Sequence, residues 1–107
     1  MRGNLIKAAL EPLGFPVWRL VYKGKESTFF TFQMVLGLPI IHADDESTEF
    51  SEIWRVDLYS RIDYTELLEQ AMENLKRAGF SVSVDPETYE SGTGFFHVPL
   101  NLEFTEV

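Results

Sequence analysis

The feature that most constrains the fold is an amphipathic helix set between two segments in which polar and apolar residues alternate. Over residues 63–79, apolar side chains recur at spacings of three and four, which places them along one helix face. Asp63 and Glu66 have the spacing of a capping box at its start, and Gly79 fits the left-handed position at its end. The apolar stripe consists of Tyr64, Leu67, Leu68, Ala71, Met72, Leu75 and Ala78.

The alternating segments predict two strands, each with one buried face. Residues 53–60 place apolar side chains at every second position, and residues 96–104 do the same. Pro99 lacks an amide donor, so we expect the last strand to lie at a sheet edge or to be bulged. The predicted core comprises Trp54, Val56, Leu58, Leu68, Met72, Leu75, Leu100 and Leu102, because both strands present these faces to the helix stripe.

The remaining elements are shorter. A helix is expected over residues 4–13 with Asn4 as its cap, and strands over 17–22 and 28–36, which the short turn between them predicts to form a hairpin. Residues 42–52 and 85–94 form polar loops, and residues 80–84 form a short strand. The predicted fold is a single α+β domain over residues 1–107, in the order α-β-β-β-α-β-β. Its two helices pack on one face of a mostly antiparallel sheet.

Charge and composition limit the function classes. The net charge is −8, which disfavours a role in coating nucleic acid. The balance is uneven, since residues 1–25 carry a net charge of +4 and residues 26–107 carry −12. Two faces of opposite sign favour adhesion to a partner or to a second copy, whereas the simpler interpretation is that the acids keep the chain in solution. Cysteine is absent, and no apolar run is long enough to cross a membrane or to form a signal-peptide core, which predicts a chain that stays in the cytoplasm during synthesis.

Catalytic chemistry finds little support in the sequence. His42 and His97 belong to no recognisable motif, and we interpret His97 as a surface residue on the polar face of a strand. His42 and the acids that follow it have the oxygen ligands of a hard cation but not the spacing of a calcium loop. Asp57 and Glu103 could pair across strands, although such pairs arise by chance in an acidic chain. We therefore expect no catalytic, cofactor-binding or metal-binding residues.

Interaction surfaces are better supported. The strands carry apolar residues on both faces, and two helices can cover only one face of a sheet. Either another subunit covers the second face, or the long loops make the core locally two-sided. The candidate interface residues are the basic Arg19, Lys23 and Lys25, the apolar Phe29 and Val35, and the acidic Asp44, Asp45, Glu46 and Glu49. We expect the acidic loop to lie against a neighbour's basic hairpin or to face the lumen of an assembly.

The order of these features resembles the small tail-terminator, or tail-completion, proteins of long-tailed bacteriophages and prophages. The resemblance covers nearly the whole chain. Its first half rests on a short helix, on Gly14-Phe15-Pro16-Val17 entering a strand, on Phe29-Phe30-Thr31-Phe32, and on a loop carrying Ala43-Asp44. Its second half rests on Val56-Asp57-Leu58-Tyr59-Ser60, on the helix through Leu67, Leu68 and Leu75, and on Gly79-Phe80 and Phe96-His97.

The resemblance implies a structural virion protein without catalytic residues or cofactor. Such proteins form a hexameric ring that caps the tail tube and joins it to the head-completion protein. DNA passes through the ring without specific binding. The implied location is the head-proximal end of the tail, after assembly in the host cytoplasm. The alternative from another class is a cytoplasmic α+β binding module, monomeric or dimeric, that recognises a small ligand or a protein.

Overall fold

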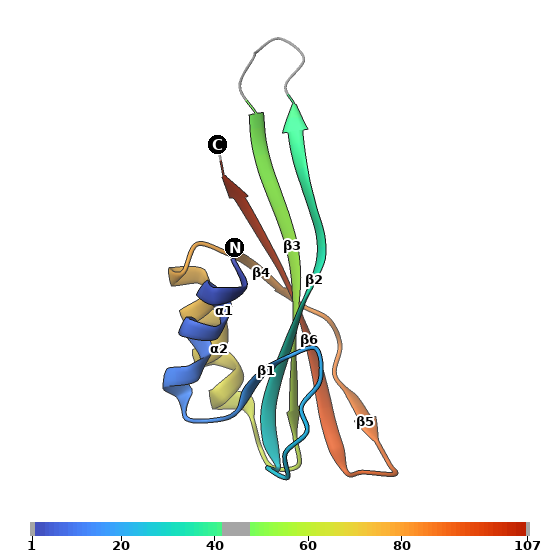
Figure 1. Cartoon of the computed structure of the whole chain (residues 1–107). Coiled ribbons are helices and arrows are strands. Elements are labelled where there is room, and N and C mark those ends of the chain that lie inside the picture. The colour runs from blue at the N-terminus through green and yellow to red at the C-terminus, as the bar shows by residue number, and fades with distance from the viewer. Residues whose placement is uncertain (1, 42–47, 107) are drawn as a thin grey trace.

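The computed structural model describes the backbone of residues 2–41 and 48–106 and the side chains of residues 2–36 and 51–104. Two helices lie side by side on one face of a six-stranded, mostly antiparallel sheet, so the predicted α+β class is confirmed (Figure 1). The elements are α1 (Gly3–Leu10), the 3-10 turn η1 (Glu11–Leu13), β1 (Val17–Arg19), β2 (Thr28–Ile41), β3 (Thr48–Ser60), α2 (Thr65–Arg77), β4 (Ser81–Val84), β5 (Thr88–Glu90) and β6 (Phe95–Glu106).

The core fills the space between the helices and the sheet. The long strands β3 and β6 pair from Phe50 with Glu106 to Ser60 with Phe96, and they supply the centre of the buried face. Six of the eight predicted core residues are buried, while Leu68 and Met72 on α2 are half-buried at the margin. The buried apolar residues are Ile6, Leu10, Val17, Phe30, Phe32, Trp54, Val56, Leu58, Ala71, Leu75, Phe80, Val98, Leu100 and Leu102.

The predicted end of α2 is confirmed. Gly79 has a φ of 107°, in the left-handed region. The Phe80 amide donates to the Leu75 carbonyl at 3.2 Å and the Gly79 amide donates to the Lys76 carbonyl at 3.0 Å, which together form a Schellman motif. Phe80 is buried as the apolar contact behind the turn.

The predicted starts of both helices were wrong. Helix α1 begins at Gly3, and Arg2 rather than Asn4 occupies the cap position, with no side-chain cap hydrogen bond. A Cβ at Gly3 would meet the Trp54 ring at 3.0 Å, so the glycine lets the start of the helix lie close to the core. Helix α2 begins at Thr65, and Asp63 accepts hydrogen bonds from the backbone amide and the hydroxyl of Thr65 instead of forming a capping box. These two bonds hold the pKa of Asp63 below its usual range.

The expected hairpin between the first two strands is also wrong, because β1 and β2 pair in parallel. Strand β1 ends at Arg19, and Leu20 follows with a φ of 67°. The Val21 amide then donates to the Arg19 carbonyl at 2.8 Å, which turns the chain sharply away from β2. Residues 20–27 carry the chain back past β1. Strand β2 therefore starts level with the residues that precede β1.

The second and third strands are longer than predicted. Strand β2 continues to Ile41 and β3 starts at Thr48, so much of the expected loop over residues 42–52 is paired backbone. Acidic composition predicted a loop, but the backbone pairs of β2 with β3, and of β3 with β6 as far as Phe50, continue past the helices. In the same way, the expected polar loop over residues 85–94 contains β5, whose three residues are all exposed.

Pro99 lies in the interior of the sheet, contrary to the expected edge position. Strand β6 has β3 on one side and β4 and β5 on the other. The Pro99 carbonyl accepts the Asp85 amide at 3.0 Å, just beyond the end of β4 and before β5 begins. The amide and the carbonyl of a strand residue point to the same side of the strand. The amide that Pro99 lacks would therefore face the place where β4 has ended and β5 has not yet begun.

Candidate functional site

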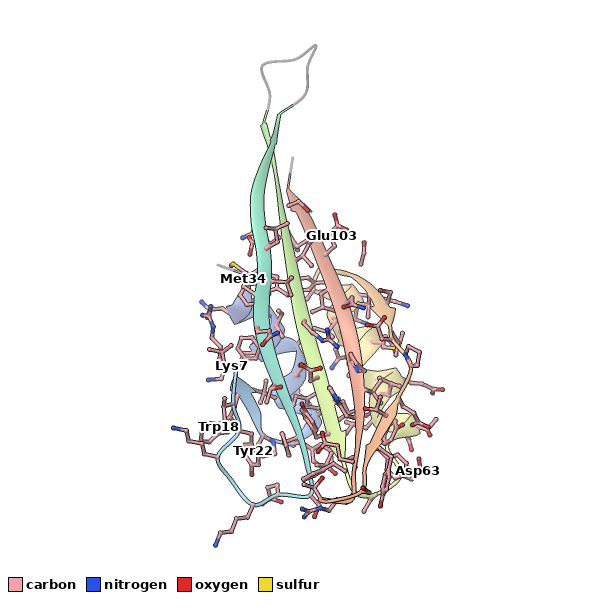
Figure 2. All side chains as sticks on the ribbon, turned by 90° about the vertical axis from the view of Figure 1, so that its right-hand side faces the viewer. Lys7, Trp18, Tyr22, Met34, Asp63 and Glu103 are labelled. Carbon is pink, nitrogen blue, oxygen red and sulfur yellow. The ribbon has the colours of Figure 1, made fainter. Side chains whose placement is uncertain are left out.

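The face of the sheet turned away from the helices carries a row of aromatic side chains. Figure 2 views this open face, with the helices behind the sheet. The Phe29 ring stacks on Tyr22 at 4.3 Å and on Tyr59 at 5.0 Å between centroids, and Tyr59 stacks on His97 at 4.4 Å. Phe29, Tyr59 and His97 occupy one rung across β2, β3 and β6. The rings half-bury one another, which gives the body of the sheet a thin second apolar layer.

An ion pair lies beside this row. The His97 Nε2 lies 2.6 Å from the Asp57 Oδ1, and the Arg55 Nε lies 3.3 Å from the same oxygen. Burial raises the pKa of the Tyr59 phenol above its ordinary value of 10.0, and the carboxylates of Asp57 and Glu90 raise it further. His97 is therefore packed and paired, rather than the free surface residue that was expected.

The Asp57–His97 pair was not predicted, because its partners are 40 residues apart in the chain. Asp57 and Glu103 do not face each other, because Asp57 pairs with Pro99 and Glu103 pairs with Ile53. Glu103 accepts a hydrogen bond from the Ser51 hydroxyl at 3.1 Å instead. Only the register of β3 on β6 brings Asp57 and His97 together. Among residues 2–36 and 51–104, no three His, Asp or Glu side chains gather in a group that could hold a metal.

The predicted interface residues do not form one patch. The Arg19 guanidinium lies 5.6 Å from the centroid of the buried Trp54 ring, whereas Phe29 belongs to the aromatic row on the opposite face. Lys23 and Lys25 are exposed in the loop that leads into β2, and Val35 is 57% exposed farther along that strand. Asp44, Asp45 and Glu46 lie outside the described residues, and the backbone of Glu49 pairs with Ile40 within β3 and β2.

Exposed apolar side chains gather instead along the outer side of β1 and β2. Leu20 and Val21 are 62% and 58% exposed, and Met34, Val35 and Leu36 follow on the neighbouring strand. The Leu20 amide donates to the Phe32 carbonyl at 2.9 Å, so the two groups adjoin. We call these five residues the edge cluster. Strict alternation along β2 would place Met34 and Leu36 on one face with Phe30. Met34 is exposed because the helix layer ends below it, and the β-bulge between Met34 and Leu36 places Leu36 opposite Ile53 instead.

Above the edge cluster, β2 and β3 continue as an arm, which we define as the paired residues 36–41 and 48–53. The arm projects beyond the helices, and the molecule is 52 Å long but only 26 by 23 Å across (Figure 1). The 14 residues of β2 span about 45 Å at the usual rise of a strand. Ile41 and Thr48 therefore lie at the opposite end of the sheet from the basic loop that precedes Thr28.

Comparison with known proteins adds no name to this geometry. Neither the scan against protein-family models nor the search of the curated proteins finds a match to this chain. Within the described ranges, no helix is long and apolar enough to cross a membrane.

Proposed function

We propose that the chain is a structural subunit of a bacteriophage tail, a tail terminator that assembles into a ring on the end of the tail tube. The arm is the observation that carries the proposal. Beyond the helices, β2, β3 and the end of β6 form a narrow extension with no helix layer over it. Such an extension gains little from its own core, so its length is best explained by contacts with other subunits. The resemblance of the sequence to tail terminators points the same way.

The electrostatics agree with this role. A net charge of −8 per copy repels the phosphate backbone, which suits a ring through which DNA passes without specific binding. In this proposal Asp57 and His97 tie β3 to β6 and perform no chemistry. The partners are further copies of the chain, the tail-tube protein and the head-completion protein.

Mass measurement and electron microscopy test the proposal. The purified protein is measured alone and after mixing with tail tubes of the phage or prophage that encodes it. We expect closed rings, or rings that form on the tube ends, and tubes that stop growing when the protein is added. A strict monomer that neither binds tube ends nor limits their length would contradict the proposal, and would favour the binding-module alternative.

A further inference from the structure

The outer edge of β2 is free above the short strand β1. In the described part of the chain, β1 covers only Phe30 to Phe32, and no strand pairs with the outer side of β2 beyond them. Natural edge strands are usually protected by charged side chains. Here Met34, Val35 and Leu36 are uncharged and 40%, 57% and 43% exposed. The bulge at this point adds twist but leaves these side chains uncovered. Pro39 lacks an amide donor, so the stretch of the edge that is suited to pairing with another strand ends at residue 38.

A second free edge lies at the same level on the other side of the sheet. Strand β4 pairs with β6 only as far as Glu103, which leaves the outer side of residues 104–106 without a strand partner among the described residues. Through β3, residues 104–106 occupy the same rungs as residues 37–39 of β2. Both strands are antiparallel to β3, so they run in the same direction.

This geometry favours a ring over a pair. A copy rotated about an axis parallel to the strands would bring its β6 beside β2 of the first copy at nearly the same height. The contact joins two different surfaces, and contacts of that kind close into a ring when the rotation permits. A twofold contact of β2 with β2 would instead place the strands antiparallel and leave both β6 edges unused.

Charge distinguishes the two edges as well. The edge formed by α1, β1 and the loop before β2 carries Lys7, Arg19, Lys23 and Lys25, which Glu11 and Glu26 only partly offset. The edge formed by β4, β5 and β6 carries Asp85, Glu87, Glu90 and Glu103, which Arg61, bonded to the Thr93 carbonyl, only partly offsets. Lys7 and Glu103 mark the two sides in Figure 2. Unlike edges therefore attract and like edges repel, which favours the head-to-tail contact.

We propose that the free edge of β2 over residues 33–38 pairs with the free edge of β6 over residues 104–106 in a second copy of this chain. The sheet then continues from one subunit to the next, and the second copy lies beside Met34, Val35 and Leu36. This inference rests on the proposed ring and assigns the two surfaces that form it.

Disulfide trapping tests the contact, because the chain contains no cysteine. Leu36→Cys and Thr105→Cys are prepared separately and mixed under oxidising conditions. Cysteines at directly opposed positions of adjacent strands come within the 7 Å Cα separation that a disulfide requires. Residues 36 and 105 are opposed when residues 104–106 pair with residues 35–37. We expect a covalent dimer only in the mixture, and a ladder of multimers from the chain that carries both substitutions. Leu36→Cys mixed with Glu69→Cys is the control, because Glu69 is exposed on α2 and away from both edges.

The outcomes separate this inference from the function on which it rests. Covalent dimers of Leu36→Cys alone would place β2 against β2 and overturn the proposed contact. Rings that form on tube ends but give no mixed dimer would also overturn the contact, while leaving the proposed function intact. A multimer ladder without any binding to tube ends would support the contact and contradict the tail-terminator function.

Discussion

Gly79 connects α2 to β4 in a conformation and a space that only glycine fits. Its φ is 107°, and a Cβ there would meet the Phe104 ring at 2.8 Å. We expect Gly79→Ala to lower the free energy of unfolding by at least the 1–2 kcal/mol or so that a left-handed residue with a side chain costs. Urea unfolding measures the change. Gly92→Ala is the matched control, because a Cβ at that position meets nothing within 4 Å. Equal stability of the two variants would contradict the role assigned to Gly79.

The raised pKa of the Tyr59 phenol predicts that the folded state loses stability in alkaline solution. Burial holds its pKa above the ordinary 10.0, so the folded state keeps the proton longer than the unfolded state does. The resulting contribution is complete below the unfolded pKa and is lost as the pH rises through the folded value. We expect Tyr59→Phe to reduce the fall in unfolding free energy between pH 9 and pH 11.

Urea melts across that pH range make the measurement. The control is Tyr89→Phe, which removes a hydroxyl from a side chain that is 57% exposed. The two variants should differ in the steepness of the alkaline fall. If Tyr59→Phe and the unmodified protein lose stability equally, burial does not disfavour the Tyr59 phenolate as inferred.

Among the elements, α2 was predicted best because it interacts mostly with its own neighbours in sequence. Its stripe, its basic last turn and its glycine end all follow from spacings of a few residues. The parallel β1–β2 pair could not be predicted, since it depends on one positive φ at Leu20, a residue type that rarely adopts it. The Asp57–His97 pair depends on a register between strands separated by α2, which no local pattern encodes.

Leu75 on α2 is fully buried between the helices and the sheet, so its side chain should contribute to the stability of the fold. We expect Leu75→Ala to lower the free energy of unfolding by about 2–5 kcal/mol, the usual range for a large-to-small change in a core. Gln70→Ala on the exposed side of the same helix should change it little. Urea melts that show no difference between these variants would mean that the register assigned to α2 is wrong.

At the scale of the whole molecule, the basic side of the sheet should guide assembly. Lys23→Glu combined with Lys25→Glu is expected to weaken ring formation at low salt, where exposed charges act beyond the roughly 8 Å of physiological screening. Sedimentation of the variant and the unmodified protein at two salt concentrations makes the comparison. Normal assembly of the double variant at low salt would show that these two lysines do not contribute to assembly.

A second pair of substitutions, made in the same chain, identifies the acidic segment that faces Lys23 and Lys25. Reversing Glu87 and Glu90 to lysine in the same chain should partly restore assembly if the β4–β5–β6 edge faces the lysines. Reversing Asp44 and Asp45 should restore it instead if their segment contacts a neighbour, as the charge pattern of the sequence first suggested. These two acids lie outside the described residues, so only this comparison bears on them.

The interior position of β6 also affects how the chain is made. Strand β6 comes last of the described elements in sequence, yet it lies between β3 and the pair β4 and β5. On the ribosome, β3 emerges long before its second neighbour exists, and β4 and β5 have no strand to join until residues 95–106 appear. The sheet therefore cannot be completed during most of translation. Until β6 appears, the nascent chain carries unpaired strand backbone, which can lead to aggregation. A nonsense mutation just before Phe95 would remove β6 and leave β4 and β5 without the strand with which both pair.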